Sequence, residues 1–295
     1  MDFSRFRGTT VALITPFLAN GAVDEAGYKK LLDWQIALGT DVILTCGTTG
    51  ESATLSHIEH EKVIELTIHH VNGRVPVLCG AGSNATSEAI SLSKFAEKAG
   101  ADAILSVAPY YNKPTQEGLY QHFKAIAESV KTPVILYNVP GRTGSNISAQ
   151  TTLRLAQISN IIGIKEASGN FSQIMAILKD RPKGFLVLSG DDAITLPMIA
   201  AGADGIISVV ANQAPALLHE MVHSALNNQW ERARELHYKL LPLMEFNFIE
   251  SNPIPVKTGV ALMGLIEENF RLPLVKMTDA NRQTMKKMLA DLGLL

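Results

Sequence analysis

The chain contains eight short runs of β-branched and aliphatic residues, and none of them alternates strictly between apolar and polar positions. Strands that are covered on both faces, as in a parallel sheet, have such continuous apolar runs. The pattern therefore predicts eight buried parallel strands. They are residues 10–14, 42–46, 75–79, 103–107, 134–138, 161–165, 185–189 and 205–209.

Segments with the helical spacing of apolar residues separate these runs, at residues 25–38, 58–71, 87–99, 117–130 and 148–158. The phrase Ala-Gly-Ala-Asp occurs twice, at residues 99–102 and 201–204, and marks equivalent helix-to-strand turns. One strand follows the next after about 20 to 34 residues, which is the size of a βα unit with short loops. Eight such units favour an α/β fold of the closed (β/α)8 TIM barrel type, with an open doubly wound sheet as the main alternative.

Beyond residue 215 the strand pattern stops, and residues 216–227, 229–248, 255–263 and 280–292 have helical spacing. The first of these helices completes the barrel. The rest form a helical appendage without a core of its own, and no linker separates it from the barrel. We therefore predict a catalytic barrel at residues 1–228 and a C-terminal helical domain at residues 229–295 that packs on it.

Composition narrows the class of protein. Twenty-six Lys and Arg residues against 28 Asp and Glu residues give a net charge of −2, which argues against nucleic acid or an anionic membrane as partner. Cys46 and Cys79 lie in apolar segments and are expected to be buried, reduced thiols. No apolar run approaches the roughly 18 residues of a membrane span. We expect a cytoplasmic enzyme or binder of small molecules.

Lys165 is the most unusual residue in the pattern, because it ends an otherwise apolar strand. Functional groups of a barrel gather where strands end and βα loops begin. Burial disfavours the charged form of an amine, and a desolvated lysine can form a Schiff base with a carbonyl compound. The alternatives are a lysine that reaches solvent at the rim or pairs with Glu166.

Two other strand ends carry candidate binding groups. Residues 47–52 read GTTGES, in which two glycines allow the backbone to present consecutive N–H groups to a carboxylate or phosphate. Tyr137 lies near the end of the 134–138 strand, and Arg142 follows a Pro-Gly turn. The phenol of Tyr137 and the guanidinium of Arg142, which can bind a carboxylate, are therefore expected at the same end of the barrel. Each motif alone also fits an ordinary turn, a core tyrosine or a surface arginine.

Two further groups of polar residues are weaker candidates. His57 and His60 could share a metal ion, but no third ligand is evident, and a solvated helix face explains them better. No metal site is predicted. Asp191 and Asp192 could hold a cation or cap the following helix, and capping is favoured.

Four motifs occur together, in an order and spacing typical of one family: GTTGES at 47–52, PYYNKP at 109–114, YNVPGRTG at 137–144 and IKEASG at 164–169. With these motifs the chain resembles the dihydrodipicolinate synthase family of the class I aldolase and pyruvate lyase superfamily. The resemblance covers essentially the whole chain, including ESNPIPVK at 250–257. Sialic acid lyases usually lack the arginine at position 142. One departure is Thr258, where many members have tryptophan.

The resemblance implies that the chain condenses pyruvate with L-aspartate 4-semialdehyde to 4-hydroxy-tetrahydrodipicolinate, the first committed step of diaminopimelate and L-lysine biosynthesis. Lys165 would form the imine with pyruvate, and no metal or organic cofactor would be needed. Protons would pass through Tyr137, Thr48 and Tyr111, the last reaching in from a neighbouring subunit. The substrate-binding residues would be Thr49, Arg142, Gly190 and Ile207.

The resemblance also implies an allosteric site for L-lysine and a homotetramer built from two tight dimers. The allosteric residues would be Ser52, Ala53, His57, His60, Gly82, Asn84, Glu88 and Tyr110. Two other functions stay open. One is a sister Schiff-base lyase that acts on sialic acid or a keto-deoxy sugar acid. The other is a barrel-shaped protein that senses pyruvate or lysine, against which the retained lysine, tyrosines and threonine argue.

Overall fold

The computed structural model describes residues 3–295, in which eight parallel strands pair in chain order and close into a barrel. The strands are β1 (Gly8–Ala12), β2 (Val42–Thr45), β3 (Val77–Gly80), β4 (Ala103–Val107), β5 (Val134–Asn138), β6 (Ile161–Glu166), β7 (Leu186–Ser189) and β8 (Gly205–Ser208). Pairing of β1 with both β2 and β8 closes the barrel. The eight predicted strands are confirmed, and closure excludes the open sheet.

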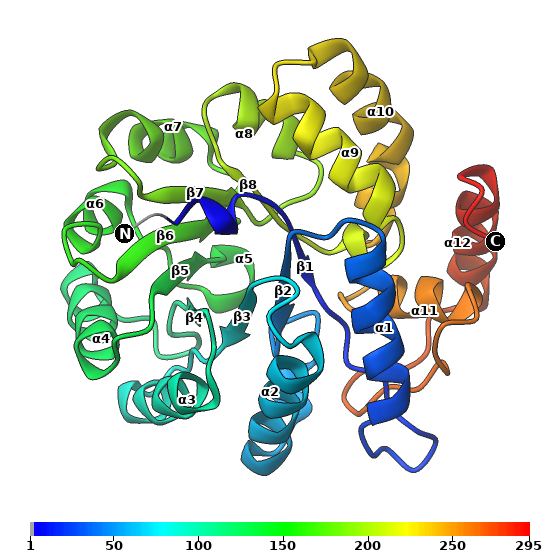
Figure 1. Cartoon of the computed structure of the whole chain (residues 1–295), viewed down its shortest axis with the longest axis horizontal. Helices are drawn as coiled ribbons and strands as arrows, with labels where there is room; N and C mark the ends of the chain where they lie inside the picture. The colour runs from blue at the N-terminus through cyan, green and yellow to red at the C-terminus, as the bar shows by residue number, and fades with distance from the viewer. Residues whose placement is uncertain (1–2) are drawn as a thin grey trace.

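Helices surround the strands on the outside of the barrel (Figure 1). They are α1 (Glu25–Ala37), α2 (His57–Val71), α3 (Thr86–Ala99), α4 (Gln116–Ser129), α5 (Pro140–Thr143), α6 (Ala149–Leu155), α7 (Phe171–Asp180), α8 (Thr195–Ala200) and α9 (Pro215–Leu226). The described residues also include 3-10 helices at η1 (Ser4–Phe6), η2 (Ser52–Thr54) and η3 (Val210–Asn212).

Two hydrophobic cores account for the apolar strands. Successive residues of a strand point to opposite faces, so neighbouring positions contribute to different cores. Leu44 of β2 and Leu188 of β7 belong to the core inside the barrel, whereas Ile43 and Val187 belong to the core between strands and helices. Tyr137 is part of the inner core, which places its ring inside the barrel near the carboxyl end of β5.

The last helices are α10 (Trp230–Phe246), α11 (Ile254–Leu262) and α12 (Asp279–Asp291). In Figure 1 they run along one side of the barrel, beyond α9 and α1. Arg271, between α11 and α12, donates to the carbonyls of Gly21 and Thr54 and pairs with Glu59. The hydrogen bond from Arg271 lowers the pKa of Glu59 to about 2. These contacts attach the region to loops of the barrel.

The domain division at residue 228 stays a prediction, and residues 1 and 2 of the first segment lie outside the described residues. Cys46 and Cys79 are free and buried, as expected, and burial raises the pKa of Cys46 to about 12. Among residues 3–295, no helix is long and apolar enough to cross a membrane.

Three aspartates occupy equivalent positions at the amino end of the barrel. Asp41, Asp102 and Asp204 directly precede β2, β4 and β8. Each accepts a hydrogen bond from a backbone N–H near the start of the preceding strand. The donors are Thr9 at 2.7 Å, Val77 at 2.8 Å and Val187 at 3.0 Å. We call these three hydrogen bonds between an aspartate and the neighbouring strand latches. The two aspartates of the repeated Ala-Gly-Ala-Asp phrase, Asp102 and Asp204, form two of the three.

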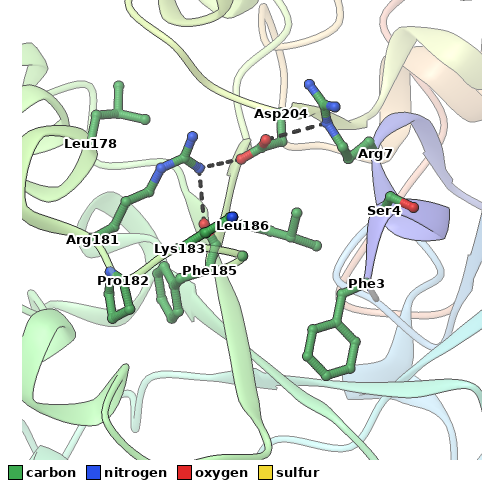
Figure 2. A pocket seen from close by; sticks show the side chains of 11 residues that line it. Phe3, Ser4, Arg7, Leu178, Arg181, Pro182, Lys183, Phe185, Leu186 and Asp204 are labelled. Carbon is green, nitrogen blue, oxygen red and sulfur yellow. Dashed lines mark hydrogen bonds and ion pairs between the residues drawn. The ribbon is translucent and has the colours of Figure 1, made fainter. Parts of the chain in front are cut away.

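Charged partners also hold these aspartates. Arg5 lies 2.8 Å from Asp102. Figure 2 shows Asp204 between two arginines: Arg181, which also donates to the Phe185 carbonyl, and Arg7, at 3.4 Å. Asp102 and Asp204 are thus each held by a backbone N–H and an arginine, and these pairs join Arg5 and Arg7 to the starts of β4 and β8.

Candidate active site

Lys165 and Tyr137 lie side by side at the carboxyl end of the barrel. They are register partners on β5 and β6, and their side chains are only 5% and 6% exposed. The Lys165 Nζ lies 4.3 Å from the centroid of the Tyr137 ring. Within residues 3–295 the amine has no carboxylate partner, and the Tyr137 hydroxyl has no hydrogen-bond partner. Both groups are therefore available to a bound molecule.

Glu166 does not pair with Lys165, because successive strand residues point to opposite faces. Its carboxylate instead accepts hydrogen bonds from Asn138 Nδ2 at 3.1 Å, Gln173 Nε2 at 3.2 Å and the Ser168 N–H at 2.7 Å. Glu166 thus joins the loops that follow β5 and β6. Both alternatives for Lys165, a pair with Glu166 and a reach to solvent at the rim, fail.

The loop after β2 has the backbone geometry that its two glycines predict. It turns back through hydrogen bonds from the Gly50 and Ser52 N–H groups to the Gly47 carbonyl. In the part of the chain that the structure describes, the N–H groups of Thr48 and Thr49 have no acceptor. Two adjacent unpaired amides at the rim of a cavity form a ready site for an anionic oxygen.

A buried ion pair that the sequence patterns did not reveal supports this loop. Glu51 has a left-handed backbone, with φ of 54°, and its carboxylate binds the ammonium of Lys257 from α11. Both side chains are 0% exposed, and burial lowers the pKa of Lys257 to about 8. Asn252 adds a hydrogen bond of 3.1 Å from Nδ2 to Thr49 Oγ1. The C-terminal region thereby positions the loop that carries Thr48 and Thr49.

These elements enclose a cavity of about 140 Å³. Its lining residues are Thr48, Thr49, Tyr137, Val139, Arg142, Lys165, Ala167, Gly190, Asp191, Val209, Phe248 and Asn252. Arg142 is exposed on the short helix α5, and its guanidinium has no ion-pair partner between residues 3 and 295. The cavity thus offers an amine, a phenol, two free amides and a guanidinium, which together suit a small carboxylate with a reactive carbonyl.

Gly190 and Ile207 differ in their relation to this cavity. A Cβ atom at Gly190 would lie 2.7 Å from the Cβ of Ala167 and 3.0 Å from Cε of Lys165, so the glycine leaves room beside the amine. Ile207 is buried in the inner core of the barrel. It is not among the lining residues, and its neighbour Val209 is. A direct role of Ile207 in substrate binding stays a prediction.

Comparison with known proteins decides the family. The model of the dihydrodipicolinate synthetase family matches residues 5–292. The chain belongs to this family. It is 55% identical, over 99% of its own length and 97% of the relative's, to the 4-hydroxy-tetrahydrodipicolinate synthase of Koribacter versatilis.

Two solved structures of dihydrodipicolinate synthases extend the likeness to three dimensions. The enzyme from Acinetobacter baumannii, solved in complex with pyruvate, has a TM-score of 0.96 and 47% identity, with 98% of this chain and 99% of that chain covered. The enzyme from Cyanidioschyzon merolae, solved with lysine bound, has a TM-score of 0.96 and 38% identity, with 99% of each chain covered. The family fold therefore extends over the C-terminal helices as well as the barrel.

A second cavity, of about 400 Å³, adjoins the first, and Thr48, Val139 and Arg142 line both. Seven of the eight residues that family resemblance assigns to an allosteric site line it: Ser52, Ala53, His57, His60, Gly82, Glu88 and Tyr110. The eighth, Asn84, is not a lining residue, and its carbonyl accepts a hydrogen bond from Asn112. The shared residues bring the two cavities into contact.

The polar groups of the second cavity are arranged around Glu88. His57 Nε2 lies 2.7 Å from the Glu88 carboxylate, and the Ser83 hydroxyl donates to it. The hydrogen bond from Ser83 is the main cause that lowers the pKa of Glu88, and His57 adds to it. His60 is buried, with Nε2 2.7 Å from the Gly80 carbonyl, and burial lowers its pKa. Glu88 thus provides an anionic group in the second cavity.

Tyr110 and Tyr111 point to different surroundings. Tyr110 lines the second cavity, whereas the side chain of Tyr111 is 90% exposed and lines neither cavity of its own chain. Tyr111 and Lys113 have positive φ angles of 71° and 43°, which non-glycine residues rarely adopt. The strained segment holds the Tyr111 ring away from its own barrel.

The expected capping role of Asp191 and Asp192 is wrong, because α8 begins without a side-chain cap. Asp192 is buried and accepts hydrogen bonds from the N–H groups of Val209 and Val210, both at 3.1 Å. Burial raises the pKa of Asp192 to about 6. The residue therefore fixes the loop after β8, and its neighbour Asp191 lines the smaller cavity.

Proposed function

We propose that this chain condenses pyruvate with L-aspartate 4-semialdehyde through a Schiff base on Lys165. The product is 4-hydroxy-tetrahydrodipicolinate, so the chain serves diaminopimelate and L-lysine biosynthesis as a lyase. The observation that carries the proposal is the unpaired Lys165 amine beside Tyr137 in a cavity with free backbone amides. Relatives that bear the synthase name and the pyruvate complex from Acinetobacter baumannii support the assignment.

The first half of the reaction takes place on pyruvate. The neutral Lys165 amine attacks the keto carbon, and loss of water gives an imine whose protonated form withdraws electrons. A methyl proton then leaves and an enamine forms. The pyruvate carboxylate would accept hydrogen bonds from the Thr48 and Thr49 amides, which holds the keto carbon near the amine.

The second half uses the semialdehyde. The enamine carbon attacks the aldehyde, and its oxygen takes up a proton to become the product hydroxyl. The amino group of the semialdehyde then attacks the imine carbon, closes the ring and releases Lys165. Proton transfers would pass through Tyr137, Thr48 and Tyr111 of a neighbouring subunit, because hydroxyl groups both donate and accept. Arg142 would hold the carboxylate of the semialdehyde with its planar fork.

Turnover with two aldehydes separates this function from that of a sister lyase. We expect product with pyruvate and L-aspartate 4-semialdehyde and none with pyruvate and N-acetylmannosamine. Arg142→Ala should raise KM for the semialdehyde about tenfold or more and leave KM for pyruvate nearly unchanged, because a hydrogen-bonded charge contributes about 1.5–3 kcal/mol. Preference for the amino sugar, or an equal rise in both KM values, would refute the assignment.

We also propose that the cavity around Glu88 binds L-lysine as a feedback inhibitor. The anionic Glu88 suits an ammonium group, and the lysine-bound structure from Cyanidioschyzon merolae supports the proposal. Initial rates should fall over millimolar lysine. Glu88→Gln should require about tenfold more lysine without a change in kcat. Glu65→Gln on the exposed face of α2 is the matched control, and equal inhibition of both variants would contradict the site.

We also propose that the chain acts in the cytoplasm as a homotetramer of two tight dimers, in which Tyr111 enters the neighbour's active site. The exposed Tyr111 ring, which lines neither cavity of its own chain, supports the shared site. Tyr111→Phe and Lys165→Ala should each be inactive alone. A mixed dimer of the two variants contains one intact site, so activity should return when subunits exchange. Mass measurement by light scattering should give four chains, and a mixture that stays inactive despite subunit exchange would disprove the shared site.

A further inference from the structure

At the amino end of the barrel, Asp41 has different partners from the other two latch aspartates. Arginines pair with Asp102 and Asp204, but two histidines one turn apart on α9 face Asp41. His223 Nε2 lies 2.8 Å and His219 Nδ1 3.5 Å from Asp41 Oδ2. Arginine keeps its proton and cannot bind a metal, whereas a neutral imidazole is a common metal ligand.

We propose that Asp41, His219 and His223 form a site for a divalent transition metal ion, with Zn²⁺ as the best fit. Two imidazoles and one carboxylate form a donor set that zinc prefers, and the three ligand atoms lie within 4.8 Å of one another. Bonds of about 2.0–2.1 Å in a tetrahedron place two ligands about 3.3 Å apart. The His219–Asp41 separation already matches this value, and that of His223 needs a small opening.

The His219 ring provides independent support. Its Nδ1 atom is buried and faces Asp41, but it has no hydrogen-bond partner among residues 3–295. Buried polar atoms are usually hydrogen-bonded, and this nitrogen has only the long 3.5 Å contact to Asp41, a spacing that suits two ligands of one ion. His223 Nε2 and Asp41 Oδ2, 2.8 Å apart, would separate slightly to admit the ion between them.

Gly8 packs closely against the proposed ligands. A Cβ atom at Gly8 would lie 2.3 Å from Asp41 Oδ2 and 3.0 Å from His223 Nε2, so a larger residue would clash with both. Gly8, Asp41 and His223 line a cavity of about 400 Å³ with room for water as a fourth ligand. Arg5 and Arg7 line the same cavity, but their charges are engaged by Asp102 and Asp204.

The surroundings of Asp41 also suit a ligand. Its Oδ2 accepts a hydrogen bond of 2.7 Å from the Thr9 N–H, and metal-binding carboxylates are commonly oriented by such bonds. An ion here would clamp α9 to the starts of β1 and β2. The site lies at the opposite end of the barrel from the catalytic cavity, so this inference goes beyond the proposed function and does not depend on it.

The test is zinc binding by untagged protein, measured by competition with a chromophoric chelator. We expect one ion for each chain. Removal of one outer-shell partner costs about 10- to 100-fold in metal affinity, so loss of a ligand in His219→Ala or His223→Ala should cost at least as much. His69→Ala, an exposed histidine near the end of α2, is the matched control and should bind zinc like the unmodified protein.

Two further measurements distinguish loss of the metal site from misfolding of a variant. Co²⁺ should give visible absorption bands of a four-coordinate ion in the unmodified protein and in His69→Ala only. Binding should weaken from pH 8 to pH 6, because the hydrogen bond to Asp41 raises the pKa of His223 and a protonated imidazole cannot bind metal. Arg5, Arg7 and His219 also face the site, and burial lowers the pKa of His219. Failure to bind zinc at 100-fold excess, or equal binding by all variants, would overturn the proposal.

Discussion

The two ends of the barrel differ in how their polar groups are satisfied. At the amino end, Asp102 and Asp204 each bind a backbone N–H and an arginine. At the carboxyl end, the Lys165 amine and the Thr48 and Thr49 amides have no partner within residues 3–295. Fully bonded polar groups stabilise a fold, whereas unpaired groups in a cavity are free to bind a substrate.

Two buried lysines at the carboxyl end of the barrel, Lys165 and Lys257, differ in the same way. Lys165 is 5% exposed and lies over a tyrosine ring, while Lys257 is 0% exposed and binds Glu51. Burial alone therefore does not make a lysine reactive. Lys165 differs from Lys257 in having no carboxylate partner within residues 3–295, which fits the nucleophilic role proposed for it.

The largest expected effect is on Lys165. Lys165→Met should lower kcat/KM by on the order of 10⁴-fold or more, because no other group can form the imine. Its stability should stay equal or rise, since an unpaired buried amine is replaced by an apolar chain of similar length. Activity assays and urea unfolding of the same sample check both. Loss of stability together with activity would give Lys165 the structural role assigned to Lys257.

The second effect concerns the Lys257–Glu51 pair. Lys257→Met should lower the free energy of unfolding by about 3–5 kcal/mol, because it leaves the Glu51 carboxylate buried without a partner. The double variant Lys257→Met/Glu51→Gln should recover much of this loss. Denaturant unfolding of both single variants and the double variant gives the coupling free energy. If the two single losses simply add, the pair does not support the loop.

The third effect compares two buried tyrosines. Tyr137→Phe should lower kcat by about 10²- to 10³-fold through loss of a proton-transfer group, with unchanged stability. Tyr28 is the matched control, because its hydroxyl bonds to Thr45 and Thr67 and none of these residues lines the cavity. Tyr28→Phe should lose about 1 kcal/mol of stability and keep its activity. The same profile for both variants would remove Tyr137 from the chemistry.

The smallest effects belong to the amino end. Asp204→Ala should lower the free energy of unfolding by about 1–3 kcal/mol, because the Val187 N–H and two arginines lose their acceptor. Arg5→Ala removes an exposed pair with Asp102 and should change stability by less than about 1 kcal/mol. Both variants should retain full kcat. A tenfold fall in kcat of either variant would show that the two ends are not independent.

Much of the barrel could be predicted because its signals are local. Continuous apolar runs locate all eight strands, and the lysine that ends the sixth run, Lys165, lies in the cavity at the carboxyl end of the barrel. The two glycines of residues 47–52 indicate the amide pair in the same way. Such features depend on the strand or turn that contains them, so the sequence alone carries the information.

The rest depends on contacts between distant segments. Lys257 contacts Glu51, and Asn252 contacts Thr49, across more than 200 positions of the sequence. No local sequence pattern predicts contacts of this kind. The prediction for Asp192 was wrong for the same reason. The N–H groups that donate to its carboxylate belong to the loop after β8 and not to the helix that follows Asp192. An aspartate before a helix is a cap only when the chain turns it toward that helix.

The most direct test of the account is the reduction of the protein with borohydride in the presence of pyruvate, followed by mass analysis of its peptides. We predict one covalent adduct, with the mass of reduced pyruvate, on the peptide that contains Lys165, and none on the peptide that contains Lys257. An adduct on Lys257, or no adduct at all, would contradict the claim that the unpaired lysine at the carboxyl end carries the chemistry.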